Sequence, residues 1–228
     1  DGRSFSASSS GLTLTGEGTR DSLVFTYDFP GSAARFVIVY RFRSDSYLVD
    51  VRGRVEGLEN RGYALLIDVG QGLRSNEKNV DEDRGQYAMV TYGEEAGVES
   101  VGFDDVEDGE VRPATGGPFH WVAMKSKYFL AAAVAPDGGP LFGGATIRGT
   151  PVDGSARITA TMPVPAGSEG FALEMFLGPQ DYGRLDAIGQ DLQDVNSYGY
   201  QWLQPVIRPL VAIVMPILVW MHTNFNLA

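Results

Sequence analysis

Two residues of this chain are of types that carry out proton transfer. His120 lies beside Trp121 in a predicted strand, and Glu174 lies in another. A histidine and a carboxylate that converge in a cleft can perform the acid–base chemistry of a sugar-modifying enzyme. No motif links the two residues, so we interpret His120 as a structural histidine. A carbohydrate-binding or mutarotase-like β-sandwich protein is kept as the alternative hypothesis.

Two further motif matches fail on their spacing. The acidic run 104–110 resembles a calcium loop, but Val106 stands at its third ligand position and Thr115 at its twelfth. A solvated turn explains the run better. Ser75 and Lys78 match the Ser-x-x-Lys pattern, without the companion motifs that the chemistry requires. We therefore predict that the protein is not an enzyme and holds neither a metal nor a cofactor.

The composition excludes several classes of partner. The chain of 228 residues carries a net charge of −11, and only three of its 18 basic residues are lysines. This balance argues against binding to nucleic acid. The absence of cysteine excludes disulfides, iron–sulfur clusters and thiolate zinc sites. With 43% hydrophobic and 21% charged residues, the chain has the composition of a folded globular protein.

The first 177 residues read as short strands separated by turns. Their apolar runs are rich in β-branched and aromatic residues, and Gly, Pro, Asp and Ser punctuate them. We predict strands over 23–27, 34–43, 47–55, 63–69, 86–92, 100–104, 119–124, 128–134, 145–148, 156–162 and 170–177. Residues 36–40 contain no polar position, which predicts burial on both faces. This pattern favours antiparallel sheets packed as a sandwich.

Helical character begins after Gly178. Pro179 suits the first position of a helix, and Gly189 is expected to end it. A second short turn is predicted over 191–195.

The last 31 residues have a different composition. Arg208 is the only charged residue from Tyr198 onward. Apolar residues recur there at helical spacing: Trp202, Val206, Leu210, Ile213, Ile217 and Trp220. The uncharged stretch 209–221 is shorter than the roughly 20 residues that span a bilayer. It therefore predicts either a helix at a membrane interface or a helix docked on the sandwich. We expect the chain to be part of a longer protein.

Three segments resemble the large periplasmic domain of the YidC family of bacterial membrane protein insertases. The first is 121–136, in which a Trp strand runs through a Tyr-Phe pair to a proline. The second is 176–182, which resembles the family's x-Gly-Pro-Lys-x-Tyr motif. The third is Tyr198-Gly-Tyr200 with the apolar tail. The residues that carry the resemblance are Trp121, Lys127, Tyr128, Phe129, Pro136, Gly178, Pro179, Tyr182 and Gly199.

The resemblance implies a mainly β fold, an antiparallel β-supersandwich followed by short C-terminal helices. Residues 1–177 would form the supersandwich, 178–197 the linking helices, and 198–228 an amphipathic interface helix that leads towards a transmembrane region. It also implies a place on the periplasmic side of the bacterial inner membrane. The implied function is assistance in membrane protein insertion and folding. The implied partners are the inner-membrane lipid surface, nascent membrane proteins, SecD–SecF and the Sec translocon.

Overall fold

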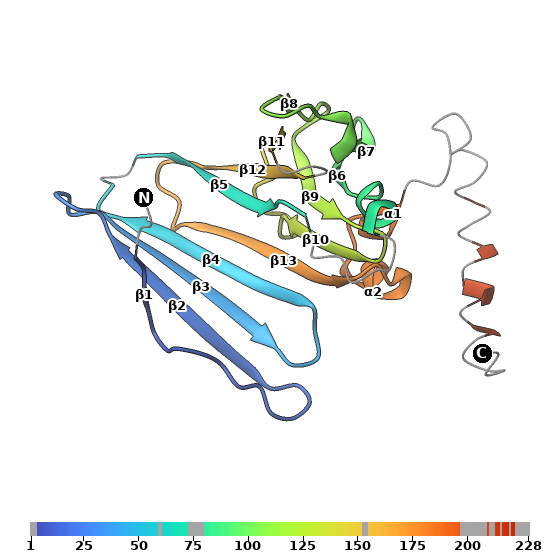
Figure 1. Ribbon diagram of the computed structural model, residues 1–228. Coiled ribbons are helices and arrows are strands. Elements are labelled where there is room, and N and C mark those ends of the chain that lie inside the picture. Colours follow the sequence, from blue (N-terminus) through green and yellow to red (C-terminus); the bar gives the residue numbers. More distant parts are fainter. Residues whose placement is uncertain are drawn as a thin grey trace.

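A computed structural model of the chain describes residues 4–58, 61–72, 80–151 and 155–196. In the tail it describes Pro209, Ile213, Val214, 216–218, Trp220 and Met221. Two antiparallel sheets and a few short helices make up the structure (Figure 1). The predicted mainly β fold with short C-terminal helices is confirmed.

The larger sheet has nine strands in the order β1-β2-β3-β4-β13-β10-β9-β6-β7. Every pair of neighbouring strands in it is antiparallel. The strands are β1 (Ser6–Ala7), β2 (Arg20–Asp28), β3 (Arg35–Arg43), β4 (Leu48–Glu56), β6 (Ala88–Gly93), β7 (Gly97–Gly102), β9 (Phe119–Lys125), β10 (Phe129–Val134) and β13 (Phe171–Pro179).

The smaller sheet has four strands in the order β5-β12-β11-β8. They are β5 (Tyr63–Gly70), β8 (Val111–Pro113), β11 (Gly144–Gly149) and β12 (Ala156–Val164). In β12, buried residues alternate with more exposed ones, as expected for a strand with one face against a core. The helical elements are α1 (Val80–Arg84), η1 (Phe103–Asp105), α2 (Tyr182–Ile188) and η2 (Leu192–Val195).

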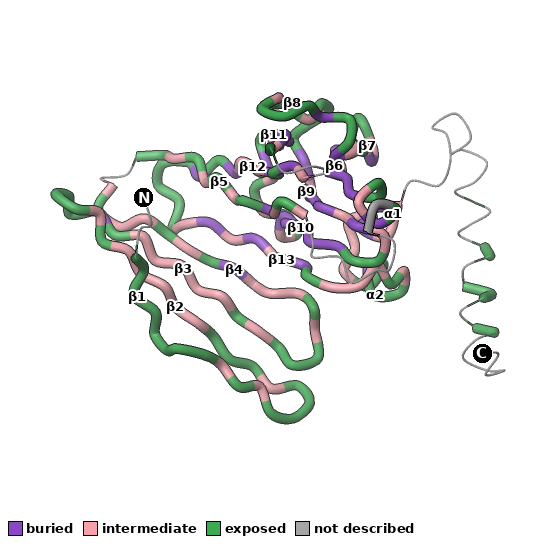
Figure 2. Tube along the Cα trace, in the orientation of Figure 1, coloured by how far each residue is buried: buried purple, intermediate pink, exposed green. Residues whose placement is uncertain are grey.

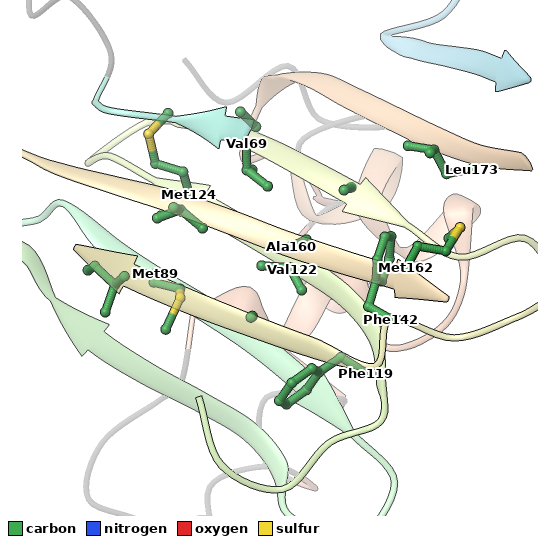
Figure 3. Close-up of a cluster of buried hydrophobic side chains, with 14 of the residues drawn as sticks. Val69, Met89, Phe119, Val122, Met124, Phe142, Ala160, Met162 and Leu173 are labelled. Carbon is green, nitrogen blue, oxygen red and sulfur yellow. The ribbon is translucent and has the colours of Figure 1, made fainter. Parts of the chain in front are cut away.

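The main core lies between the two sheets. Val122 and Met124 of the larger sheet belong to the same buried cluster as Ala160 and Met162 of the smaller one (Figure 3). Phe142, in the connection to β11, is completely buried in this cluster. The smaller sheet thus covers one face of the larger sheet's centre.

The opposite face of that centre is covered by α2 and η2. Leu185 of α2 and Leu192 and Val195 of η2 form a second buried cluster with Trp121 of β9 and Val134 of β10. Consecutive residues of β9 therefore enter different cores, which explains why this strand is apolar almost throughout.

Strands β1–β4 extend beyond the smaller sheet (Figure 1). Figure 2 shows this part of the molecule mostly as intermediate and exposed. Residues 36–40 of β3 are all of intermediate burial, so the prediction that they are buried on both faces is wrong. These residues are apolar, but the smaller sheet ends at β5 and leaves their side chains partly exposed.

The helix after Gly178 begins later than predicted. Pro179 is the last residue of β13, and Asp181 is the N-cap of α2, its carboxylate accepting from the Arg184 amide at 2.9 Å. Gly189 ends the helix with φ of +85°, as expected of a C-terminal glycine. The short elements β1, β8 and α1 carry too few residues to show a periodic pattern.

In the tail, the described residues that carry a helix assignment are exposed. Among the predicted stripe residues, Ile213 is 63% exposed, Ile217 50% and Trp220 58%. Trp202, Val206 and Leu210 lie outside the described residues. Within the described part of the chain, no helix combines the length and apolar character needed to cross a bilayer.

Candidate functional site

The residues of the first two resembling segments meet where the C-terminal helices dock on the larger sheet. We call this region the helical seat: Trp121, the β9–β10 turn at 126–129, and residues 178–196. Trp121 is completely buried at its centre. Its indole Nε1 donates a hydrogen bond of 2.9 Å to the Gln190 carbonyl, between α2 and η2. Its ring stacks on Tyr92 of β6 with centroids 5.9 Å apart.

Gln190 fixes the connection between the two helices. Its side-chain amide donates to the Ala135 carbonyl at 2.8 Å and to the Asp137 carboxylate at 2.9 Å. Gln190 and Asp191 both have φ of +55°, a left-handed conformation that costs free energy for residues other than glycine. The bonds that Gln190 donates to the residues on either side of Pro136, and the bond that it accepts from Trp121, hold the chain in this conformation.

Gln180 connects separate parts of the chain at the other end of the seat. Its backbone amide donates to the Tyr128 carbonyl at 2.8 Å. Its side-chain nitrogen donates to the carbonyls of Ser126 at 2.7 Å and Phe129 at 3.0 Å. Its side-chain oxygen accepts from Asn196 Nδ2 at 2.8 Å. One glutamine thus joins the β9–β10 turn to the last described residue before the tail.

Lys125 closes this network. Its ammonium donates to Asn196 Oδ1 at 3.2 Å, and burial lowers the pKa of Lys125. A charged group placed there is disfavoured unless it has a polar partner. Asn196 supplies that partner, so the end of η2 is held from both Gln180 and Lys125.

Gly178 is needed because an aromatic ring packs against it. A Cβ at this position would lie 2.7 Å from Tyr47 Cγ and 3.0 Å from Phe176 Cζ. The Tyr47 ring is in turn covered by the Arg184 guanidinium of α2, 5.2 Å from the ring centroid. The glycine therefore lets α2 dock close to the sheet.

The other residues predicted from the resemblance lie at the edges of the seat. Lys127 pairs with Glu82 of α1 at 2.8 Å. Tyr128 and Phe129 are about half exposed on the turn that Gln180 holds. Tyr182 is the first residue of α2. Gly199 lies outside the described residues.

The sequence pattern does not indicate the polar residues that assemble the seat: Gln180, Gln190, Asn196 and Tyr47. The partners of the three amide residues lie 16 to 71 residues away in the chain, and the partners of Tyr47 lie farther still. The local signal for them is the recurrence of amide residues in and around the two short helices: Gln180, Gln190, Gln193 and Asn196.

The structure does not bring the two candidate proton-transfer residues together. In the described part of the chain, His120 Nε2 lies 3.4 Å from Glu94, and the imidazole packs 5.3 Å from the Tyr92 ring. Glu174 lines a hollow of about 540 Å³ with Asp50, Arg41 and Arg43. Burial, and next the charge of Asp50, raise the pKa of Glu174.

The acidic run at 104–110 is a turn whose carboxylates bond locally. Asp105 accepts from the Gly102 amide at 3.1 Å, and Glu110 pairs with Arg112. Among the described residues, no group of three or more histidine or acidic side chains could hold a metal ion.

We expect Gln180→Ala to destabilise the protein by about 1–3 kcal/mol, because the carbonyls of Ser126 and Phe129 lose their shared donor. Urea unfolding measures this loss. Hydrogen exchange should show faster opening of 182–196 than of the central strands. Gln86→Ala, at an exposed position, is the matched control. Equal stability of the two variants would contradict the role given to Gln180.

Glu174→Gln should stabilise the protein at pH 7. The folded-state pKa of Glu174 is raised, so its contribution to stability falls as the pH rises above about 4.5 through that folded value. The amide removes this cost, and its advantage over the parent should shrink as the pH is lowered towards 4.5. Melting temperatures across this range measure the effect. Glu169→Gln, which makes the same charge change at an exposed position, controls for net charge.

Comparison with solved structures finds likeness at low similarity. A GH36 α-galactosidase AgaA variant of Geobacillus stearothermophilus, in complex with stachyose, covers 82% of this chain and 29% of its own, with a TM-score of 0.46 and 12% identity. The α-galactosidase AgaB of the same organism gives a TM-score of 0.42 at 11% identity, covering 80% and 28% of the two chains.

Sequence comparison is far more specific. The membrane protein insertase YidC of Chlorobaculum tepidum is 30% identical over 94% of this chain and 37% of its own length. That of Chlorobium phaeovibrioides is 30% identical over 92% of this chain and 36% of its own. The chain therefore spans little more than a third of these relatives. Residues 2–213 match the family described as the YidC periplasmic domain, and on this evidence the chain belongs to that family.

Proposed function

We propose that this chain is the periplasmic domain of a membrane protein insertase, which assists insertion, folding and assembly of inner-membrane proteins. The match to proteins named membrane protein insertase YidC over more than nine tenths of the chain carries this proposal. The domain acts by contacts and by position, without covalent chemistry of its own. It lies on the periplasmic side of the inner membrane.

The helical seat supports this role because it fixes where the tail leaves the sandwich. Asn196 is bound by Gln180 and Lys125, and the segment from Tyr198 onward carries only Arg208 as a charged residue. An apolar helix gains free energy at the headgroup boundary of a bilayer. The acidic sandwich is repelled by anionic lipid, so most of it stays in water. Residues 198–228 would thus lie at the membrane, with the sandwich held above it.

The partners follow from this placement. The lipid surface contacts the tail, and nascent membrane proteins emerge close to the sandwich. SecD–SecF and the Sec translocon are further partners that an insertase of this family would meet there.

One prediction of this proposal concerns membrane attachment. The chain 1–228 should float with liposomes, and a chain that ends before Tyr198 should not, because it lacks the uncharged apolar segment. Flotation in a density gradient measures the difference. Unchanged melting of the shorter chain would show that its sandwich is intact. Equal flotation of both would contradict a membrane-binding tail.

Another prediction of this proposal concerns insertion itself. In the full-length protein, expressed in cells depleted of their own insertase, removal of 1–197 should slow insertion, because it removes the sandwich together with the helices of the seat. Protease accessibility of a newly made membrane protein provides the readout. Normal insertion after this deletion would reduce the domain to a spacer and overturn an active role.

A further inference from the structure

Exposed apolar side chains of the sandwich gather at one end. Seven large hydrophobic residues are exposed in the described sandwich: Phe5, Tyr47, Leu66, Val111, Tyr128, Phe129 and Leu177. Four of them stand where β4 and β10 begin and where β13 ends. We call these four, Tyr47, Tyr128, Phe129 and Leu177, the exit tip.

The register of the strands places two members of the exit tip, Phe129 and Leu177, side by side, and the ring of Tyr47 lies on the opposite face, beneath α2. Ala131 of β10 pairs with Leu177 of β13, and Phe129 pairs with Pro179, so Phe129 and Leu177 are diagonal neighbours on one face. The Leu177 amide donates to the Tyr47 carbonyl at 3.0 Å. Phe129 is 53% exposed and Leu177 51%, so an apolar surface remains open at this place.

The turn that presents Tyr128 and Phe129 is held rigidly. Ser126 and Phe129 bond to each other through the Ser126 amide, at 2.9 Å, and through the Ser126 hydroxyl, at 3.1 Å. Gln180 donates to the carbonyls of Ser126, Tyr128 and Phe129. The two exposed aromatic rings therefore project from a fixed backbone, and a partner that binds them need not order the turn first.

Cationic side chains flank these aromatic rings. Two of the chain's three lysines, Lys125 and Lys127, adjoin the turn. The Lys127 ammonium lies 5.3 Å from the centroid of the Tyr128 ring, and Arg184 lies over Tyr47. Tyrosines together with basic side chains are typical of protein surfaces at the lipid headgroup level. This arrangement stands out in a chain whose net charge is −11.

The tail leaves the sandwich at this same end. Asn196 is bound to Gln180 and Lys125, both of which adjoin the β9–β10 turn. The 31 residues from Tyr198 to Ala228 hold one charged residue, Arg208. A membrane surface to which the tail binds would therefore lie close to the exit tip.

We propose that the exit tip is a second lipid contact, which seats the sandwich on the headgroup region of the bilayer and fixes its orientation there. This inference rests on the proposed function, because the tail must bring the sandwich to the membrane. Phe129 and Leu177 enter the interface, Tyr47 and Tyr128 lie at headgroup depth, and Arg184 faces the lipid phosphates. The β1–β2 end of the larger sheet then projects away from the membrane.

Single labelled cysteines test this orientation, since the chain has none of its own. Tyr128→Cys, Leu66→Cys and Ile217→Cys are each labelled with an environment-sensitive fluorophore in chain 1–228. Vesicles of phosphatidylethanolamine and phosphatidylglycerol are added, with and without a nitroxide-bearing lipid. We expect a blue shift and quenching at positions 128 and 217. Position 66, which is 69% exposed on β5, should show neither.

The outcomes separate this inference from the function on which it rests. Quenching at 217 alone would overturn the second contact and leave the membrane-bound tail standing. Quenching at neither 128 nor 217 would overturn both. Equal quenching at all three positions would mean nonspecific adsorption and would overturn the orientation. A blue shift at position 128 in the absence of vesicles would indicate that a second copy of the chain, and not lipid, covers this position.

A paired substitution provides an independent measurement. Phe129→Ser with Leu177→Ser should weaken vesicle binding by about tenfold, since two exposed apolar side chains lose their contact with lipid. Phe5→Ser with Leu66→Ser makes the same chemical change at exposed positions away from the exit tip, and should leave binding unchanged. Circular dichroism of each variant confirms folding. Equal binding of the two double variants would overturn the proposal.

Discussion

The centre of the larger sheet is apolar on both faces, and the rest of the structure depends on covering them. Trp121, Val122 and Ala123 of β9 are consecutive residues, and all three are completely buried. Successive side chains of a strand point to opposite faces. One cover alone would leave a tryptophan or a valine in water. The smaller sheet shields one face, and α2 with η2 shields the other, which makes the C-terminal helices part of the core.

The helical cover formed by α2 and η2 is short, which explains the dense network of polar side chains around it. Helices as short as α2 and η2 are not stable by themselves. Burial of Leu185 and Leu192 supplies part of the missing stability. Hydrogen bonds from Trp121, Gln180 and Gln190 to backbone carbonyls supply the directional part. The same bonds that complete the core thereby determine where the chain leaves it.

The sequence allowed the strands and the sandwich to be predicted because their patterns are local. Most predicted strands agree with the structure within a few residues. The interpretation of residues 100–104 as a strand failed at its end, because Phe103–Asp105 turn as a 3-10 helix after β7. The helical seat is different in kind. Trp121 and Gln190 are 69 residues apart, and no local pattern could have shown that one bonds to the other.

The two ends of the molecule are built by different means. Away from the seat, β2 and β3 are joined by nine cross-strand pairs, by the Phe25–Tyr40 ring contact and by a surface ion pair between Arg35 and Asp28. Exposed ion pairs of this kind add little stability, and in the described part of the chain the smaller sheet leaves these strands only partly buried. Local opening should therefore begin there. The bonds of Gln180 and Gln190 lie elsewhere in the fold, so β1–β3 can open without changing the direction in which the tail leaves the sandwich.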